Sequence, residues 1–239
     1  MSQKEYYMKF IHDLKLLETK LREYHIEEMF NGEKQPPFTL QQYGQDEIVL
    51  LEGSELESLL FLVEGKVKIT SSVETGKSLL LRFIQPFSII GDIELIRNVP
   101  VQSQVKAINE CLLIGLHFDY IKEYEMNNPK FLHTLLEHVS YKLQTCTTAS
   151  RVNLLASVEN KFASYLMSTI SPEPDNIFGV ELKTSNIKEI ADLLGTTYRH
   201  LNRVIHSLSE KKIIERDKNS IRILNWGDLK EMSNGIRYK

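Results

Sequence analysis

The stretch that decides the fold lies at residues 186–208, which read NIKEIADLLGTTYRHLNRVIHSL. Asn186 and Glu189 match a capping box, in which a short polar side chain begins a helix and a Glu three residues later bonds back to it. Apolar residues follow in two groups at helical spacing: Ile187, Ile190, Ala191 and Leu194, then Leu201, Val204, Ile205 and Leu208. Gly195 lies between the groups, where a tight turn is needed. Two short helices whose apolar faces meet across such a turn are typical of a helix-turn-helix.

Polar side chains occupy the other face of the second predicted helix: Tyr198, Arg199, His200, Asn202, Arg203 and His206. Arginine can donate two hydrogen bonds to guanine O6 and N7, and asparagine can pair with adenine N6 and N7. A recognition helix contacts bases through its N-terminal half, which is where these residues lie. The alternative is a solvated face on an ordinary helical hairpin. The candidate DNA-binding residues are Lys188, Thr197, Tyr198, Arg199, His200, Asn202 and Arg203.

Two short apolar runs, Ile213-Ile214 and Ile221–Leu224, follow this motif and flank the polar residues 217–220. The pattern predicts a β-hairpin, or wing, beside the second helix. Basic residues of such a wing could contact backbone phosphates.

Charge is unevenly divided along the chain, although the formal net charge is only −3. Residues 151–239 hold 14 Lys and Arg against 11 Asp and Glu, a net of +3, whereas residues 1–150 hold 15 against 21, a net of −6. A positive C-terminal part is suited to approach a phosphate backbone. Differences of this size also occur by accident in enzymes, so the charge supports the motif without deciding the function.

Composition indicates a soluble globular protein, with 42% hydrophobic and 26% charged residues among 239. No apolar run approaches the roughly 18 residues of a membrane span. Residues 1–6 lack the basic start and short apolar core of a secretion signal. Two cysteines, Cys111 and Cys146, cannot form a disulfide framework. We therefore expect a cytoplasmic protein with no membrane partner.

Between Phe38 and about Leu116, glycines separate short runs of β-branched and apolar residues. These runs are Ile48–Leu51, Leu59–Val63, Val67–Thr70, Leu79–Ile84, Val105–Ile108 and Leu112–Leu116. Short strands separated by turns predict an all-β barrel or sandwich of roughly eight strands.

Asn128-Pro129 begins a long predicted helix, because proline suits a first helical turn. Its apolar residues recur at spacings of 4, 3, 4 and 3 and form a candidate dimer seam: Leu132, Leu136, Val139, Leu143 and Cys146. This period of about 3.5 residues favours a parallel dimer, and a single amphipathic helix on a globular core is the alternative. Cys146 is then either a small apolar residue or half of a redox-sensing pair.

Residues 3–30 are predicted to form a helix, since Phe10, Leu14, Leu17 and Leu21 recur at spacings of three and four. Its apolar stripe either packs on the following domain or binds a separate partner. The chain is expected to contain an N-terminal helical extension (1–36), a β-roll regulatory domain (37–126), a dimerisation helix and hinge (127–156) and a winged helix-turn-helix domain (157–239).

The order of these elements resembles the Crp/Fnr family of bacterial transcription regulators over residues 38–225. Residues 187–214 fit the family's helix-turn-helix without a gap, and residues 128–167 align ungapped with its helix pair. The resemblance implies an α+β protein with an N-terminal, jelly-roll-like β-roll sensor domain, a long dimerisation helix and a C-terminal winged helix-turn-helix. It also implies a homodimer that regulates transcription from a near-palindromic operator on double-stranded DNA.

Three recognition-helix positions contact bases in this family, and they fall on Tyr198, Arg199 and Arg203. The second is acidic in the cAMP receptor protein and basic here, so the two operators should differ. Lys188 matches a position that contacts the DNA backbone. The loop at residues 171–180 lies where relatives touch RNA polymerase, which makes the polymerase an expected partner.

The effector site is where the sequence departs from the family. Cyclic-nucleotide binders carry a phosphate cassette of Gly-Glu and, further on, Arg-Ser. Gly91-Asp92 resembles its start, but Gln102-Ser103 stands in the Arg-Ser region, and Arg97 comes several residues early. A buried cyclic phosphate without a charged partner would be poorly held, so cAMP and cGMP are not expected to bind. The candidate effector-pocket residues are Gly91, Asp92, Gln102, Ser103, Cys146 and Thr147.

Neither a metal, a cofactor nor an enzymatic activity is expected. An iron–sulfur cubane needs about four thiolates, and His133 and His138 are spaced poorly for joint metal ligation on a helix. An enzyme built on a cupin-like barrel would need clustered His, Glu and Asp, yet residues 38–116 contain no histidine. The other alternative is a cyclic-nucleotide-binding signalling module whose DNA binding is secondary, and the intact helix-turn-helix argues against it.

Overall fold

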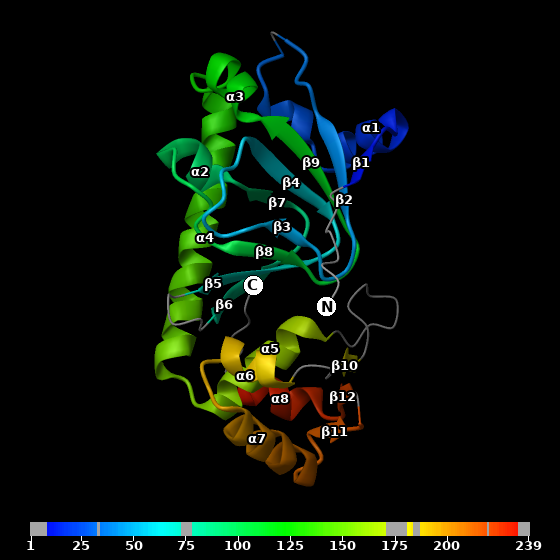
Figure 1. Cartoon of the computed structure of the whole chain (residues 1–239), viewed down its shortest axis with the longest axis vertical. Helices are drawn as coiled ribbons and strands as arrows, with labels where there is room; N and C mark the ends of the chain where they lie inside the picture. The colour runs from blue at the N-terminus through cyan, green and yellow to red at the C-terminus, as the bar shows by residue number, and fades with distance from the viewer. Residues whose placement is uncertain are drawn as a thin grey trace. The chain divides into compact units, whose positions relative to one another are not determined.

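The computed structural model describes residues 9–32, 34–72, 78–170, 181–183, 187–218 and 220–233. The chain forms two compact units, one of residues 1–69 with 84–143 and the other of residues 70–83 with 144–239. Strands dominate the first unit and helices the second (Figure 1). Among the described residues, no helix is both long and apolar enough to cross a membrane.

Two sheets form the β-roll. One has the order β1-β2-β9-β4-β7, with β1 (Lys9–Ile11), β2 (Thr39–Tyr43), β4 (Ser58–Glu64), β7 (Ser88–Ile90) and β9 (Cys111–His117). The other has the order β3-β8-β5-β6, with β3 (Ile48–Leu50), β5 (Val67–Ser72), β6 (Ser78–Ile84) and β8 (Gln104–Ala107). The six apolar runs of the sequence correspond to β3, β4, β5, β6, β8 and β9, whereas β1, β2 and β7 are not predicted by them.

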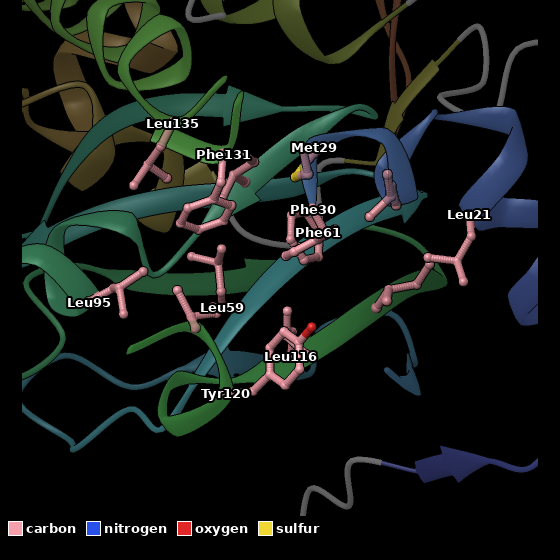
Figure 2. Close-up of a cluster of buried hydrophobic side chains, with 14 of the residues drawn as sticks. Leu21, Met29, Phe30, Leu59, Phe61, Leu95, Leu116, Tyr120, Phe131 and Leu135 are labelled. Atoms are coloured by element: carbon pink, nitrogen blue, oxygen red, sulfur yellow. The ribbon is translucent and has the colours of Figure 1, made fainter. Parts of the chain in front are cut away.

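Alternate residues of β4 and β9 fill the core of the first unit: Leu59, Phe61, Val63, Leu112, Ile114 and Leu116. Alternate residues of a strand share one face, so the two paired strands contribute to the same core. Figure 2 shows Phe30, Phe61 and Phe131, which come from three separate segments, in this cluster. The Phe30 ring centroid lies 6.5 Å from that of Phe61 and 5.7 Å from that of Phe131.

The N-terminal segment is not the single helix that its apolar spacing predicts. Lys9–Ile11 pair antiparallel with β2, and α1 (Leu14–Glu23) and the 3-10 helix η1 (Ile26–Met29) follow. The Asp13 carboxylate caps α1 by accepting from Leu16 N at 3.0 Å, which fixes a later helix start. Residues 3–8 of the predicted helix lie outside the described residues. The buried side chains of this segment join the roll's core, so it packs on the β-roll: Leu21, Ile26, Met29 and Phe30.

Helix α2 (Asp92–Arg97) follows β7, α3 (Phe118–Tyr124) follows β9, and α4 (Pro129–Leu155) follows α3. One face of α4 packs on the roll, because Phe131 and Leu135 are 1% and 4% exposed. Another face leaves large apolar side chains exposed: Leu132 (36%), Leu136 (63%), Val139 (36%) and Leu143 (68%). The stripe predicted from the 4-3-4 spacing therefore lies on an exposed side of α4.

The second unit contains α5 (Val158–Thr169), α6 (Ile187–Leu193), α7 (Tyr198–Glu210), α8 (Trp226–Met232) and a sheet of β10 (Glu181–Lys183), β12 (Ser220–Ile223) and β11 (Ile214–Arg216) in that order. Strands β11 and β12 are the predicted wing, and β10 is a third strand that the sequence pattern does not indicate. Residues 70–83 also belong here. The rings of Phe83 and Tyr165 lie 5.8 Å apart, and Asn153 Nδ2 donates to Leu80 O at 3.3 Å.

Candidate nucleic-acid interface and effector region

Helices α6 and α7 form the helix-turn-helix, and their facing sides are buried. The eight predicted apolar residues are at most 7% exposed: Ile187, Ile190, Ala191, Leu194, Leu201, Val204, Ile205 and Leu208. After α6, Thr196 N donates to Ala191 O at 2.9 Å and Gly195 N to Asp192 O at 3.0 Å. Gly195 has a φ of 64°, a left-handed conformation that glycine adopts most easily. Asn186, the predicted cap of α6, lies outside the described residues.

Thr197 is the N-cap of α7, and its hydroxyl accepts from His200 N at 3.2 Å. This bond satisfies one of the backbone N–H groups that a helix start leaves unpaired. Tyr198 is 54% exposed on the first turn. His200 is half-buried, and Lys188 is exposed on α6.

Arg199 and Arg203 lie four residues apart on the exposed side of α7, so their side chains are neighbours. In the part of the chain that the structure describes, neither guanidinium has a carboxylate partner. The His206 ring lies 3.4 Å from Glu210 one turn further on. The N-terminal half of α7 therefore carries uncompensated positive charge, which suits a polyanion.

The Asn202 amide is engaged within the protein. Its Nδ2 donates to Tyr198 O at 3.0 Å, and its Oδ1 accepts from Arg216 Nη1 at 2.8 Å. Arg216 lies at the end of β11 in the wing. The sequence suggests phosphate contacts for the basic residues of the wing as a group. It does not single out Arg216 or its contact with Asn202, because no helical or strand period links a residue of the wing to one of the recognition helix.

In the first unit, Gly91 and Asp92 begin α2. Gly91 has a φ of 95°, a left-handed conformation that favours glycine, and a Cβ there would lie 2.8 Å from Leu56 Cδ2, so the Leu56 side chain would have to shift. Asp92 is buried and accepts from Lys142 Nζ at 2.5 Å through Oδ1. Its Oδ2 is buried without a hydrogen-bond partner among the described residues.

Lys142 was not a predicted site residue, yet its position carries a signal. Counting from Phe131 along α4, Leu135, His138 and Lys142 follow at spacings of 4, 3 and 4, which places a charge on the face that packs on the roll. His138 packs edge-on against Phe87 with ring centroids 5.4 Å apart, and burial lowers the pKa of its imidazole. A lysine on a helix face that is otherwise buried needs a partner of opposite charge, so the position of Lys142 in the sequence could have indicated a buried ion pair.

The segment after α2 does not fit a cyclic phosphate. Gln102 is exposed, its backbone N–H donates to Glu94 Oε1 at 3.1 Å, and its Nε2 donates to Pro100 O at 2.6 Å. Arg97 is exposed on the last turn of α2, and Ser103 is half-buried. Residues 98–107 contain no arginine, so this segment has no guanidinium in place of the cassette arginine of the family.

The remaining effector candidates, Cys146 and Thr147, belong to the second unit, so a pocket that includes them stays a prediction. Cys146 is half-buried. Cys111 is buried, and desolvation raises the pKa of its thiol to about 11, so it is not a thiolate at neutral pH. The described residues hold no group of three or more His, Cys, Asp or Glu suited to a metal ion.

Comparison with known proteins agrees with both units. The family models "Cyclic nucleotide-binding domain" and "Crp-like helix-turn-helix domain" match residues 40–127 and 160–232. Regulatory protein YeiL of Escherichia coli O157:H7 is 25% identical over 177 residues, which cover 74% of this chain and 77% of that protein. The cAMP-activated global transcriptional regulator CRP of Salmonella typhimurium is 23% identical over 181 residues, 73% of this chain and 84% of that one.

A CRP-family transcriptional regulator from Thermus thermophilus has the same fold, with a TM-score of 0.67 at 18% identity over 83% of this chain and 98% of that one. The first family model covers the β-roll from β2 to β9 but not β1, and the second covers most of α5 together with α6, α7, the wing and α8. The chain is thus a member of the Crp/Fnr family of transcription regulators, with a cyclic-nucleotide-binding-like β-roll and a helix-turn-helix that binds DNA.

Proposed function

We propose that the protein is a cytoplasmic, homodimeric regulator that binds a near-palindromic operator and has no catalytic activity. The observation that carries this proposal is the exposed basic side of α7, where Arg199 and Arg203 lie on a helix whose other side is buried. The exposed apolar stripe of α4 supports the dimer. Two-fold symmetry would place the two α7 helices about 34 Å apart, one turn of DNA, and would require a symmetric site.

Within this proposal, Tyr198, Arg199 and Arg203 contact base edges and Lys188 contacts a phosphate. Their support is their exposure on α7 and α6 and the match of their positions to the family's contacts. The family resemblance makes RNA polymerase a further partner. The loop expected to touch it, residues 171–180, lies outside the described residues.

The β-roll acts as the regulatory module. A signal that binds one conformation of the dimer more tightly than another shifts the population toward it, and the spacing or exposure of the recognition helices changes. The shift can be no larger than the difference in the signal's affinity for the two conformations.

Replacing Arg203 and Lys188 by alanine should weaken DNA binding in two different ways. Arg203→Ala should cost about 1–3 kcal/mol on the true operator and blur one base position, because a base contact is lost. Lys188→Ala should weaken binding to all sequences alike and lower the salt slope by about one unit, because a phosphate contact is lost. An operator identified by mapping the DNA that the purified protein binds, and a scrambled duplex, are titrated at several salt concentrations.

Neither substitution removes a buried side chain, so circular dichroism should report an unchanged fold. Equal weakening of operator and scrambled duplex by both variants would make Arg203 a backbone contact. No effect from either variant would mean that α7 is not the DNA-binding surface.

Cyclic nucleotides should neither bind tightly nor change operator affinity. The reason is the absence of a cassette arginine at Gln102, together with Asp92, whose negative charge is already paired with Lys142. Calorimetry with cAMP and cGMP, and operator titration in their presence, measure both effects. Micromolar affinity would favour the alternative function, a cyclic-nucleotide-binding module, and Arg97 would be the first residue to test as the phosphate ligand.

A further inference from the structure

Both the oxygen and the nitrogen of the Asn202 side-chain amide form hydrogen bonds within the protein, and the two partners determine which way the amide is oriented. The Arg216 guanidinium can only donate, so the atom it meets at 2.8 Å is the amide oxygen. The Tyr198 carbonyl can only accept, so the atom at 3.0 Å is the amide nitrogen. Reading adenine takes both the oxygen and the nitrogen of an asparagine amide. Here both already have partners within the protein.

The wing brings Arg216 to Asn202 by strand register. Arg216 lies opposite Ile221 and Ile214 opposite Ile223, and the three isoleucines are buried. Alternate residues of a strand share a face, so Arg216 is on the same face of the wing as this packed core. Figure 1 shows β11 beside α7, the helix that contains Asn202.

Arg216 adds a third guanidinium to the exposed side of α7. Asn202 is three residues after Arg199 and one before Arg203. Arg216 is exposed and, among the described residues, has no carboxylate partner. One N–H of its guanidinium is used by Asn202, and a guanidinium has five. With Arg199 and Arg203 this gives three exposed guanidinium groups on α7 and the adjacent strand, a concentration of positive charge that attracts a polyanion.

We propose that Arg216 is a DNA-contacting residue that binds a backbone phosphate, and that Asn202 is its positioning residue and does not read a base. A recognition helix occupies the major groove, and the phosphates of the two strands border that groove. A side chain that reaches the flank of the helix from an adjacent strand meets this border. The proposal rests on the proposed DNA-binding face of α7.

The test compares Arg216→Ala, Asn202→Ala and the double variant with the full-length wild type, on operator and scrambled duplex at several salt concentrations. Arg216→Ala should weaken binding to both duplexes about tenfold, the value of a charge-assisted hydrogen bond, and lower the salt slope by about one. Asn202→Ala should weaken both duplexes by a smaller factor without blurring any base position. The double variant should bind no worse than Arg216→Ala, because Asn202 acts through Arg216.

Arg222→Ala is the matched control. Arg222 lies opposite Glu215, on the other face of the same wing, and its replacement removes the same charge. This variant should lower affinity much less than Arg216→Ala does. If both variants lose the same affinity for DNA, the effect of Arg216→Ala reflects the change in net charge and not a specific phosphate contact, and the proposal is overturned. Thermal melting tests whether Arg216 has a purely structural role. In that case Arg216→Ala would lower the melting temperature of the protein and leave the salt dependence of DNA binding unchanged.

Two further outcomes would overturn the proposal. Asn202→Ala could lose discrimination at one base pair with losses additive to those of Arg216→Ala, in which case Asn202 reads that base. Arg216→Ala could bind both duplexes like the wild type. Arg203→Ala serves as the reference in either case: if it weakens operator binding while Arg216→Ala does not, the wing contact is wrong and the recognition helix stands.

Discussion

Replacing Lys142 with methionine is expected to lower the free energy of unfolding by about 3–5 kcal/mol, because it leaves a buried carboxylate without its partner. The Asp92 side chain is 2% exposed and that of Lys142 15%. Asp92 Oδ2 already lacks a hydrogen-bond partner among the described residues, so removing Lys142 would leave both oxygens of the carboxylate without one there. Methionine keeps an unbranched apolar side chain, which limits the packing loss. Guanidinium unfolding followed by circular dichroism measures the change.

Two controls isolate the unpaired charge. Lys130→Met, at an exposed position on the first turn of α4, should change stability by less than about 0.5 kcal/mol. The double variant Asp92→Asn with Lys142→Met should recover much of the loss, since it removes both charges. If Lys142→Met costs less than about 1 kcal/mol, the pair behaves as a solvent-exposed one and the burial argument fails.

Introducing charge into the α4 stripe with Leu136→Glu and Leu143→Glu is expected to produce a monomer. These side chains are 63% and 68% exposed, so the substitutions cost the isolated chain little, whereas in a dimer they would place like charges in the seam. A monomer loses the linked second half-site, and operator affinity should fall by about 10²–10⁴. Sedimentation at micromolar concentration and operator titration measure the two effects.

Tyr141→Glu provides the control on the same helix. Tyr141 is 57% exposed but lies two residues from Val139, about 200° around α4 and outside the stripe. It should remain a dimer with wild-type operator affinity. A wild-type protein that sediments as a monomer, with or without operator DNA, would contradict the dimer altogether.

The helix-turn-helix could be predicted from sequence because its signals are local. Apolar residues such as Ile190 and Leu201 recur at helical spacing, and Gly195 has the left-handed φ that its place between the helices predicts. The strands of the roll with long apolar runs were predictable for the same reason. The strand β2 has the sequence TLQQY, which contains no apolar run. Its buried Gln41 is tolerated because the amide oxygen accepts a hydrogen bond from the Tyr43 hydroxyl, and the sequence pattern does not show this bond.

The features that the sequence does not predict depend on contacts between residues that are far apart in the chain and come together only in the folded protein. Lys9–Ile11 form a strand because an edge of the sheet is available at β2, which outweighs local helical spacing. Asp92 and Lys142 are 50 residues apart, and Asn202 and Arg216 are 14 apart. No period of a helix or a strand relates such positions. The sequence therefore predicts which side chains lie on the polar face of α7. It does not predict that one of them, Asn202, is hydrogen-bonded to a residue of the wing.

Because residues 70–83 form one unit with residues 144–239, the DNA-binding half of this protein is not encoded as a continuous stretch. A single genetic crossover near residue 144 would join a foreign β5–β6 segment to the native α5. The ring of Phe83, which now contacts Tyr165, would then come from a different ancestor than its neighbour. A hybrid that keeps this packing needs three crossovers. Recombination among relatives should therefore exchange such halves less readily than it exchanges domains that occupy a single interval of the gene.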